Sequence, residues 1–201
     1  MSEKKGFLAM FKLGAILALY AAAACVGLAF VYAGTVDKIA ENRQKDLDNA
    51  LKELFPDADA FNPIHNLVSP DPAVIFFGDI DDPANTGVFE VIKDNSIIGV
   101  ALRTSRISFS GTLKILVGVG IDGTIKGIKI LENIDTPGLG SNASRPQFYT
   151  QFTGKSVTDP FVPKQDIAAI TAATITTTAA SDSVKAAGIA AMEWLSSRGI
   201  R

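Results

Sequence analysis

Five threonines crowd into residues 171–178, Thr-Ala-Ala-Thr-Ile-Thr-Thr-Thr, just before an alanine-rich stretch. Threonine is a mediocre helix former because its side chain is β-branched, yet its hydroxyl can cap the free amides of a first helical turn. The same amides, with the partial positive charge of a helix N-terminus, also bind anions such as phosphate. The segment therefore predicts either an anion site at a helix start or an ordinary threonine-rich cap, and composition alone favours the cap.

A glycine-rich loop, Asp135-Thr-Pro-Gly-Leu-Gly140, is the second candidate for chemistry. Pro137 fixes one backbone angle, and the two glycines allow the main chain to approach a ligand closely. Such a loop can hold a flat or phosphorylated cofactor, but it is equally typical of a plain turn between a strand and a helix.

A third candidate is the aromatic segment 147–155, QFYTQFTGK. Phe148 and Phe152 lie four residues apart, on one face of a short helix that Gly154 ends. Aromatic pairs of this spacing are more often core than cofactor contacts. Lys155 is either a cation near a ligand or an ordinary surface residue.

The composition excludes several other kinds of site. Among 201 residues there is one cysteine, Cys25, and one histidine, His65, so an internal disulfide, a thiolate zinc site and histidine-centred metal chemistry have little to work with. No metal ligands are therefore assigned. Nineteen basic and twenty-one acidic side chains provide no basic field, which argues against nucleic acid as a partner.

A membrane anchor is predicted near the N-terminus. The 13–34 segment carries no charge and, at about 1.5 Å per residue, spans roughly 33 Å as a helix. Lys4, Lys5 and Lys12 precede it, so we expect the N-terminus in the cytoplasm and the following domain outside. A signal peptide cleaved after residues 31–33 is the alternative, although its apolar region is normally only about 7–15 residues.

The chain divides into three predicted parts: the cytoplasmic tip and anchor (1–34), a stalk helix with a proline-rich connector (35–86), and a folded domain (87–201). The stalk pattern ends at Pro56, and the connector has room for one strand at 73–77.

Within the domain, alternating segments predict two antiparallel hairpins, a short helix and a long final helix. The strands are expected at 88–93, 97–104, 112–119 and 124–131, the short helix from Pro146, and the long helix at about 176–197. The predicted fold class is α+β, a twisted antiparallel sheet with packed helices, preceded by one transmembrane helix.

Four segments in this order, SFSGTLKILVGVG, DTPGLG, QFYTQFTGK and ITAATITTTAASDSV, resemble the FMN-binding domain of the G subunit of Rnf ion-translocating complexes. The same domain occurs in a related protein, the C subunit of the sodium-pumping NADH:quinone oxidoreductase. The resemblance covers roughly residues 87–195, and the chain length fits the Rnf protein better.

The resemblance implies that FMN is bound covalently, through a phosphoester to Thr174, and that a separate metal-dependent flavin transferase attaches it from FAD. It implies further cofactor contacts at Thr171, Ala172, Ala173, Ile175, Thr176, Thr177, Asp135, Thr136, Leu139, Gly140, Lys155 and Phe109. Of these, Asp135, Thr136, Leu139 and Gly140 would line the ring or its polar edge, Lys155 would lie near the flavin, and Phe109 would lie beside it. Thr176 and Thr177 are expected to cap amides next to the phosphate.

Two residues depart from the family pattern. Ala172 stands where the motif usually has glycine, and if this position has a positive φ the methyl group costs about 1 kcal/mol. Asp135 stands where the family usually has glutamate, so the acid is one methylene shorter.

The resemblance implies an electron-carrying subunit of a membrane-bound ferredoxin:NAD oxidoreductase complex that moves Na⁺ or H⁺. Its partners would be the other subunits and the flavin transferase, its domain would lie on the periplasmic or extracellular side, and no turnover is expected from it alone. The alternatives are a C-type protein of the quinone reductase, a stand-alone flavinylated carrier, and an anchoring module of the same fold that carries no flavin.

Overall fold

The computed structural model describes residues 2–65, 67–78 and 87–200, with side chains from residue 10 onward. The chain forms two compact units, one within residues 1–46 and the other within residues 47–201. A single helix, α1 (Ser2–Leu54), supplies all described residues of the first unit and the first eight residues of the second. The predicted anchor and stalk therefore lie on one unbroken helix.

In the first unit, the large apolar side chains of α1 are exposed, Leu17 and Phe30 by more than 70% of their surface. Within the described part of the chain, α1 is the one helix long and apolar enough to cross a membrane. A lipid environment removes the cost of leaving such side chains in water.

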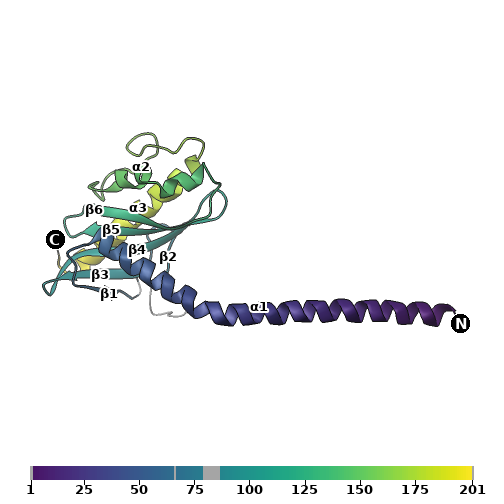
Figure 1. Cartoon of the computed structure of the whole chain (residues 1–201). Helices are drawn as coiled ribbons and strands as arrows, with labels where there is room; N and C mark the ends of the chain where they lie inside the picture. The colour runs from purple at the N-terminus through teal and green to yellow at the C-terminus, as the bar shows by residue number, and fades with distance from the viewer. Residues whose placement is uncertain (1, 66, 79–86, 201) are drawn as a thin grey trace. The chain divides into compact units, whose positions relative to one another are not determined.

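The second unit is built on an antiparallel sheet whose strands follow the order β1-β3-β4-β5-β6, while β2 pairs with β4 (Figure 1). The strands are β1 (Ala60–Pro63), β2 (Val74–Phe76), β3 (Val88–Lys93), β4 (Ser96–Ile107), β5 (Thr112–Gly120) and β6 (Ile125–Asn133). Both predicted hairpins are confirmed. Asp94 and Asn95 have positive φ values of 48° and 60°, as a tight two-residue turn between twisted strands requires, and Gly123 (φ 72°) serves the second turn.

The helical elements after the sheet are η1 (Gly140–Ser144), α2 (Pro146–Tyr149), η2 (Thr150–Phe152) and α3 (Thr174–Ser197). The predicted short helix is thus one α-helical turn that tightens into a 3₁₀ turn, and the long helix begins at Thr174, two residues before the expected start. The strand expected at 73–77 in the connector is present as β2, whereas the sequence did not predict β1.

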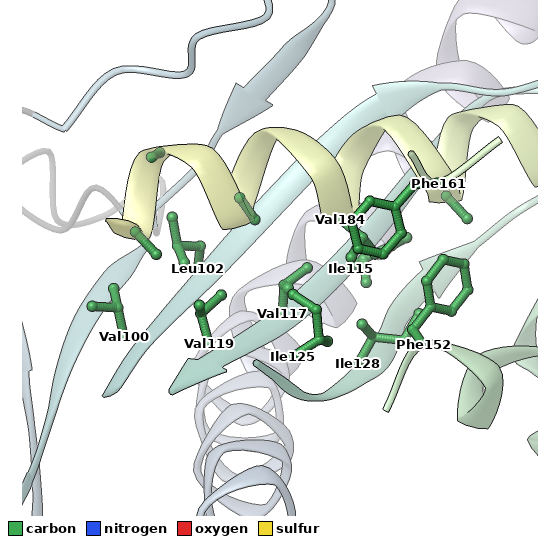
Figure 2. Packing of buried hydrophobic residues seen from close by; sticks show 14 of the residues in the cluster. Val100, Leu102, Ile115, Val117, Val119, Ile125, Ile128, Phe152, Phe161 and Val184 are labelled. Atoms are coloured by element: carbon green, nitrogen blue, oxygen red, sulfur yellow. The ribbon is translucent and has the colours of Figure 1, made fainter. Parts of the chain in front are cut away.

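One face of the sheet packs against α3 (Figure 2). Buried side chains of β4, β5 and β6 meet Val184 of α3, and Phe152 and Phe161 close one end of this core. The rings of Phe148 and Phe152 meet edge to face at 5.6 Å. The interpretation of these aromatics as core residues is therefore confirmed.

The other face of the sheet packs against the end of α1. Leu47, Ala50, Leu51 and Phe55 form a second buried cluster with Phe89 of β3 and its neighbours Val91, Ala101 and Leu116. Because strand side chains alternate between the two faces, this arrangement covers both sides of the sheet. The second unit is thus an α+β structure, as predicted, and helices cover both faces of its sheet, which the prediction did not specify.

Candidate cofactor-binding site

Three segments that are far apart in the sequence meet at a cavity of about 320 Å³. They are the β4–β5 loop, the glycine-rich loop after β6, and the start of α3. This volume lies at the lower end of the range for small-molecule sites. The cavity is lined by Phe109, Asp135, Thr136, Leu139, Gly140, Ala172, Ala173, Thr174, Ile175 and Thr176.

Among the residues that the structure describes, no side chain caps the start of α3. The N-cap position is Ala173, which has no acceptor, and Thr174 is the first helical residue, with an exposed side chain on the cavity. The ordinary threonine-rich cap that composition favoured is therefore wrong. The first-turn amides, which carry the positive end of the helix dipole, have no side-chain acceptor and lie at the edge of the cavity.

The expected capping role of Thr176 is also wrong, and the amide that Thr177 caps belongs to Ile170, before the helix, rather than to the first turn. Both side chains are buried, and their hydroxyls make other bonds. The Thr176 hydroxyl donates to Asp135 Oδ2 at 2.6 Å. The Thr177 hydroxyl donates to the Ala173 carbonyl and accepts from the Ile170 amide, each at 3.0 Å. The Thr176 hydroxyl therefore reaches the glycine-rich loop, whereas the Thr177 hydroxyl bonds to the backbone at and just before the start of its own helix.

Ala172 has a φ of 58°, in the left-handed region that disfavours a side chain. The positive φ on which the expected cost of this alanine depended is therefore present. Alanine here carries strain of about 1 kcal/mol that glycine would avoid.

Asp135 is 5% exposed and binds donors from two other segments. Its Oδ1 accepts from the Ser110 amide at 2.7 Å, and its Oδ2 accepts from the hydroxyls of Ser108 and Thr176. Burial acts to raise the pKa of this carboxyl, but these hydrogen bonds outweigh it and hold the pKa below its usual value. The cavity therefore has a permanently charged carboxylate in its wall at neutral pH.

Position 140 has no room for a side chain, which explains the glycine there. A Cβ there would lie 2.6 Å from Asp135 Cβ and 2.6 Å from Thr176 Oγ1, closer than real contacts allow. The sequence predicted that the main chain of this loop approaches a ligand closely. At Gly140 the main chain instead approaches the side chain of Asp135 and the start of α3.

Three apolar side chains form the open wall of the cavity. Phe109 is 69% exposed, and Ile175 and Leu139 are each at least 40% exposed. Opposite in character, the Thr136 hydroxyl lies 3.2 Å from that of Ser110. The cavity thus has one apolar wall and one polar end, where α3 begins.

Three of the predicted site residues do not line this cavity. Thr171 is exposed just before it, and Thr177 faces the protein interior. The Lys155 carbonyl accepts from Ile125 at the start of β6, whereas Asp135 follows the end of that strand, roughly 26 Å further at about 3.3 Å per residue. The Lys155 ammonium pairs with Asp166 at 3.4 Å, so the structure does not bring Lys155 to the cavity.

Sequence reasoning missed Ser108 and Ser110, the two partners of Asp135 in the β4–β5 loop. The available signal was the pair of serines flanking Phe109 between two predicted strands. Loop serines are common, so the pairing became visible only in the structure.

Comparison with known proteins assigns a family to this arrangement. Residues 108–188, which include every residue lining the cavity, match the FMN-binding domain, and residues 1–54 match the RnfG N-terminal region. The chain is 32% identical over 188 residues to the G subunit of the Na⁺-translocating ferredoxin:NAD⁺ oxidoreductase complex of Acetobacterium woodii, covering 87% of this chain and 88% of that protein. The chain belongs to the RnfG family, the G subunits of Rnf complexes.

Other RnfG proteins match over similar lengths. The G subunit of the ion-translocating oxidoreductase complex of Methanosarcina acetivorans is 26% identical over 177 residues, 85% of this chain and 88% of that protein. Among solved structures, NqrC of Shewanella oneidensis overlaps 61% of this chain and 66% of its own length, with a TM-score of 0.43 and 22% identity.

The cavity of this RnfG protein fits FMN in chemical character. Its apolar wall suits a flat ring, and the uncapped start of α3 suits a phosphate group.

Proposed function

We propose that this RnfG protein is an electron carrier whose FMN is linked by a phosphoester to Thr174. One observation carries the proposal. Thr174 is the first residue of an uncapped helix and presents an exposed hydroxyl at the edge of a cavity that fits a flavin. The phosphate of a cofactor attached there would lie next to the first-turn amides.

Attachment requires a second protein, because an isolated threonine hydroxyl is a poor nucleophile. A metal-dependent flavin transferase would supply FAD. The Thr174 oxygen forms a bond to the phosphorus on the FMN side of FAD, the bond from that phosphorus to the AMP phosphate breaks, and AMP leaves. The hydroxyl proton passes to a base of the transferase.

Once bound, FMN supplies the electron transfer, and the residues of this chain set its surroundings. Phe109, Leu139 and Ile175 would shield the ring from water. The charge on Asp135 opposes the addition of negative charge nearby, so it would lower the reduction potential. Lys155, predicted near the flavin, has no part in this proposal because its ammonium faces Asp166.

The proposed location is a single-pass protein of the cytoplasmic membrane, with the cavity on the periplasmic or extracellular side. The apolar α1 supports the anchor, and the lysines at positions 4, 5 and 12 support a cytoplasmic N-terminus. On the outer side a dissociated FMN would not be replaced, which gives covalent attachment a purpose.

The partners would be the other subunits of a ferredoxin:NAD oxidoreductase complex coupled to Na⁺ or H⁺ movement. Both couplings occur in the names of its relatives: Na⁺-translocating for Acetobacterium woodii and proton-translocating for Clostridium ljungdahlii. Family membership favours this complex over the quinone reductase, so we do not propose a role in the latter.

A second candidate function is an anchoring module without flavin. The observation that favours it is Ala172, whose left-handed backbone strains the segment that would receive the cofactor.

Co-expression of the full-length chain with a flavin transferase separates these functions. We expect flavin fluorescence that survives denaturing electrophoresis, a mass increase equal to one FMN phosphoester, and loss of both in Thr174→Ala. Thr178→Ala is the matched control, since Thr178 lies one helical turn further along α3 and does not line the cavity. An unmodified parent beside a loaded positive control would favour the anchoring module, and an adduct that persists in Thr174→Ala would place the link elsewhere.

A further inference from the structure

Both carboxylate oxygens of Asp135 accept hydrogen bonds from other residues of the protein. An ionised carboxylate can only accept hydrogen bonds. Oδ1 accepts from the Ser110 amide, and Oδ2 accepts from both Ser108 and Thr176. One side chain from the glycine-rich loop therefore joins the β4–β5 loop to the first turn of α3.

The helix geometry connects this bond to Thr174. At 3.6 residues per turn, residues two apart point in directions about 200° apart around the helix axis. Thr176 is fully buried against Asp135, and Thr174 is exposed on the cavity. Holding Thr176 inward therefore turns Thr174 outward.

The start of α3 needs such a restraint. It has no side-chain cap, and it follows the left-handed residue Ala172. An uncapped first turn frays readily unless tertiary contacts hold it. The described side-chain bonds that hold this turn are those of Thr176 to Asp135 and of Thr177 to Ile170 and Ala173, and the Ala173 amide also donates to the Ile170 carbonyl.

We propose that Asp135 is a positioning residue for flavin attachment: by accepting the Thr176 hydroxyl, it fixes the first turn of α3 so that the Thr174 hydroxyl is presented to the transferase. This inference rests on the proposed attachment at Thr174. It gives Asp135 a role different from contact with the flavin ring.

The space around the carboxylate also selects aspartate. The Cα of Gly140 lies so close to Asp135 and Thr176 that even a methyl group would not fit there. A glutamate at position 135 has one more methylene to place in the same space, and its carboxylate would be displaced from Thr176.

The test is the rate at which purified, flavin-free, full-length protein takes up FMN from FAD and Mg²⁺ with a purified flavin transferase. Asp135→Asn and Thr176→Val should each slow this rate by about tenfold or more, because small misplacements of a reacting group cost large factors in rate. Thr176→Ser keeps the hydroxyl and should stay close to the parental rate. Thr178→Val, a change of the same size on the same helix, is the control.

The double variant Asp135→Asn/Thr176→Val should be no slower than the slower single variant, because both changes disrupt the same bond between these two side chains. Hydrogen exchange of the Thr177 amide, which donates to the Ala173 carbonyl, should accelerate in Thr176→Val while the amides of residues 184–195 keep their protection. A general loss of stability would accelerate both groups, so this measurement separates positioning from unfolding.

Three results would overturn the inference: parental loading by Thr176→Val, failure of Thr176→Ser to restore loading, or multiplicative rate losses in the double variant. Failure of the attachment proposal looks different. In that case the parent stays unloaded or Thr174→Ala still acquires flavin, and the hydrogen-exchange comparison still decides whether the bond to Asp135 orders the helix start.

Discussion

The ring of Phe55, the first residue after α1, lies over Gly118, near the end of β5. A Cβ at position 118 would come within 2.9 Å of ring atom Cε2. Gly99, in β4, faces the same ring, and a Cβ there would lie 2.8 Å from Cε1. The two glycines form a recess in the sheet that receives the Phe55 ring.

We expect Gly118→Ala to destabilise the second unit by about 1–3 kcal/mol, since the new methyl group must displace the Phe55 ring. Urea unfolding followed by tryptophan fluorescence would measure it. On a Phe55→Leu background the same substitution should cost much less. An equal cost in both backgrounds would show that the ring is not the source of the restriction.

Ala172→Gly should increase stability by about 0.5–1 kcal/mol, because glycine adopts a φ of 58° without strain. Flavin loading should rise as well if this strain misplaces Thr174. The measurements are urea unfolding of the flavin-free protein and the loaded fraction by intact mass. A variant that is no more stable and takes up no more flavin than the parent would show that alanine is no handicap.

Asp135 should contribute stability that disappears in acid. Its pKa is lowered on folding, so the contribution is complete above the unfolded value of about 3.8 and is lost as the pH falls through the folded value. The stability difference between the parent and Asp135→Asn should therefore shrink as the pH falls from about 5 to about 2. A difference that stays constant over this range would contradict the assignment.

Asp122 provides a comparison for that titration. Bonds from Lys126 and Thr124 lower its pKa to about 2, yet its side chain is 53% exposed. Asp122→Asn should show the same sign of pH dependence with a smaller amplitude, because solvent screens exposed pairs.

Arg106 joins the connector to α3 through ion pairs with Asp71 at 3.1 Å and Asp182 at 2.8 Å. Burial raises the pKa of Asp182, and Arg106 offsets part of that effect. Arg106→Met should cost about 1–3 kcal/mol at neutral pH, since it leaves a partly buried carboxylate without this partner.

The cost of Arg106→Met should decrease in acid, because a raised carboxyl pKa makes the folded state less stable as the pH rises through it. Adding Asp182→Asn should restore part of the loss. Urea titrations at several pH values would measure both effects, and a cost independent of pH would rule out the charge as its origin.

The sequence predicted the local features of this structure. Alternating side chains and the turn pairs Asp94-Asn95 and Asp122-Gly123 placed both hairpins, because strand period and turn chemistry are local properties. The segments around Asp135 and Thr174 were each singled out, and the structure brings them to one cavity.

The sequence did not predict which distant residues Thr176 and Lys155 contact. Thr176 bonds to a residue 41 positions away, and nothing within its own segment distinguishes that partner from the backbone amides it was expected to cap. The prediction that Lys155 lies near the flavin was wrong for the same reason. Its place in the sequence, shortly after the glycine-rich loop, conceals its position at the opposite end of β6.

The second cluster of buried residues also determines where this protein can be cut. Leu47, Leu51 and Phe55 cover Phe89 and Leu116 on the sheet, although they belong to or directly follow the helix that carries the anchor. A secreted fragment that starts at residue 87 would expose that face to water, and an open apolar sheet surface promotes aggregation. A fragment that starts a few residues before Leu47 keeps the face covered, so the water-soluble form of this protein includes the last two turns of its membrane helix.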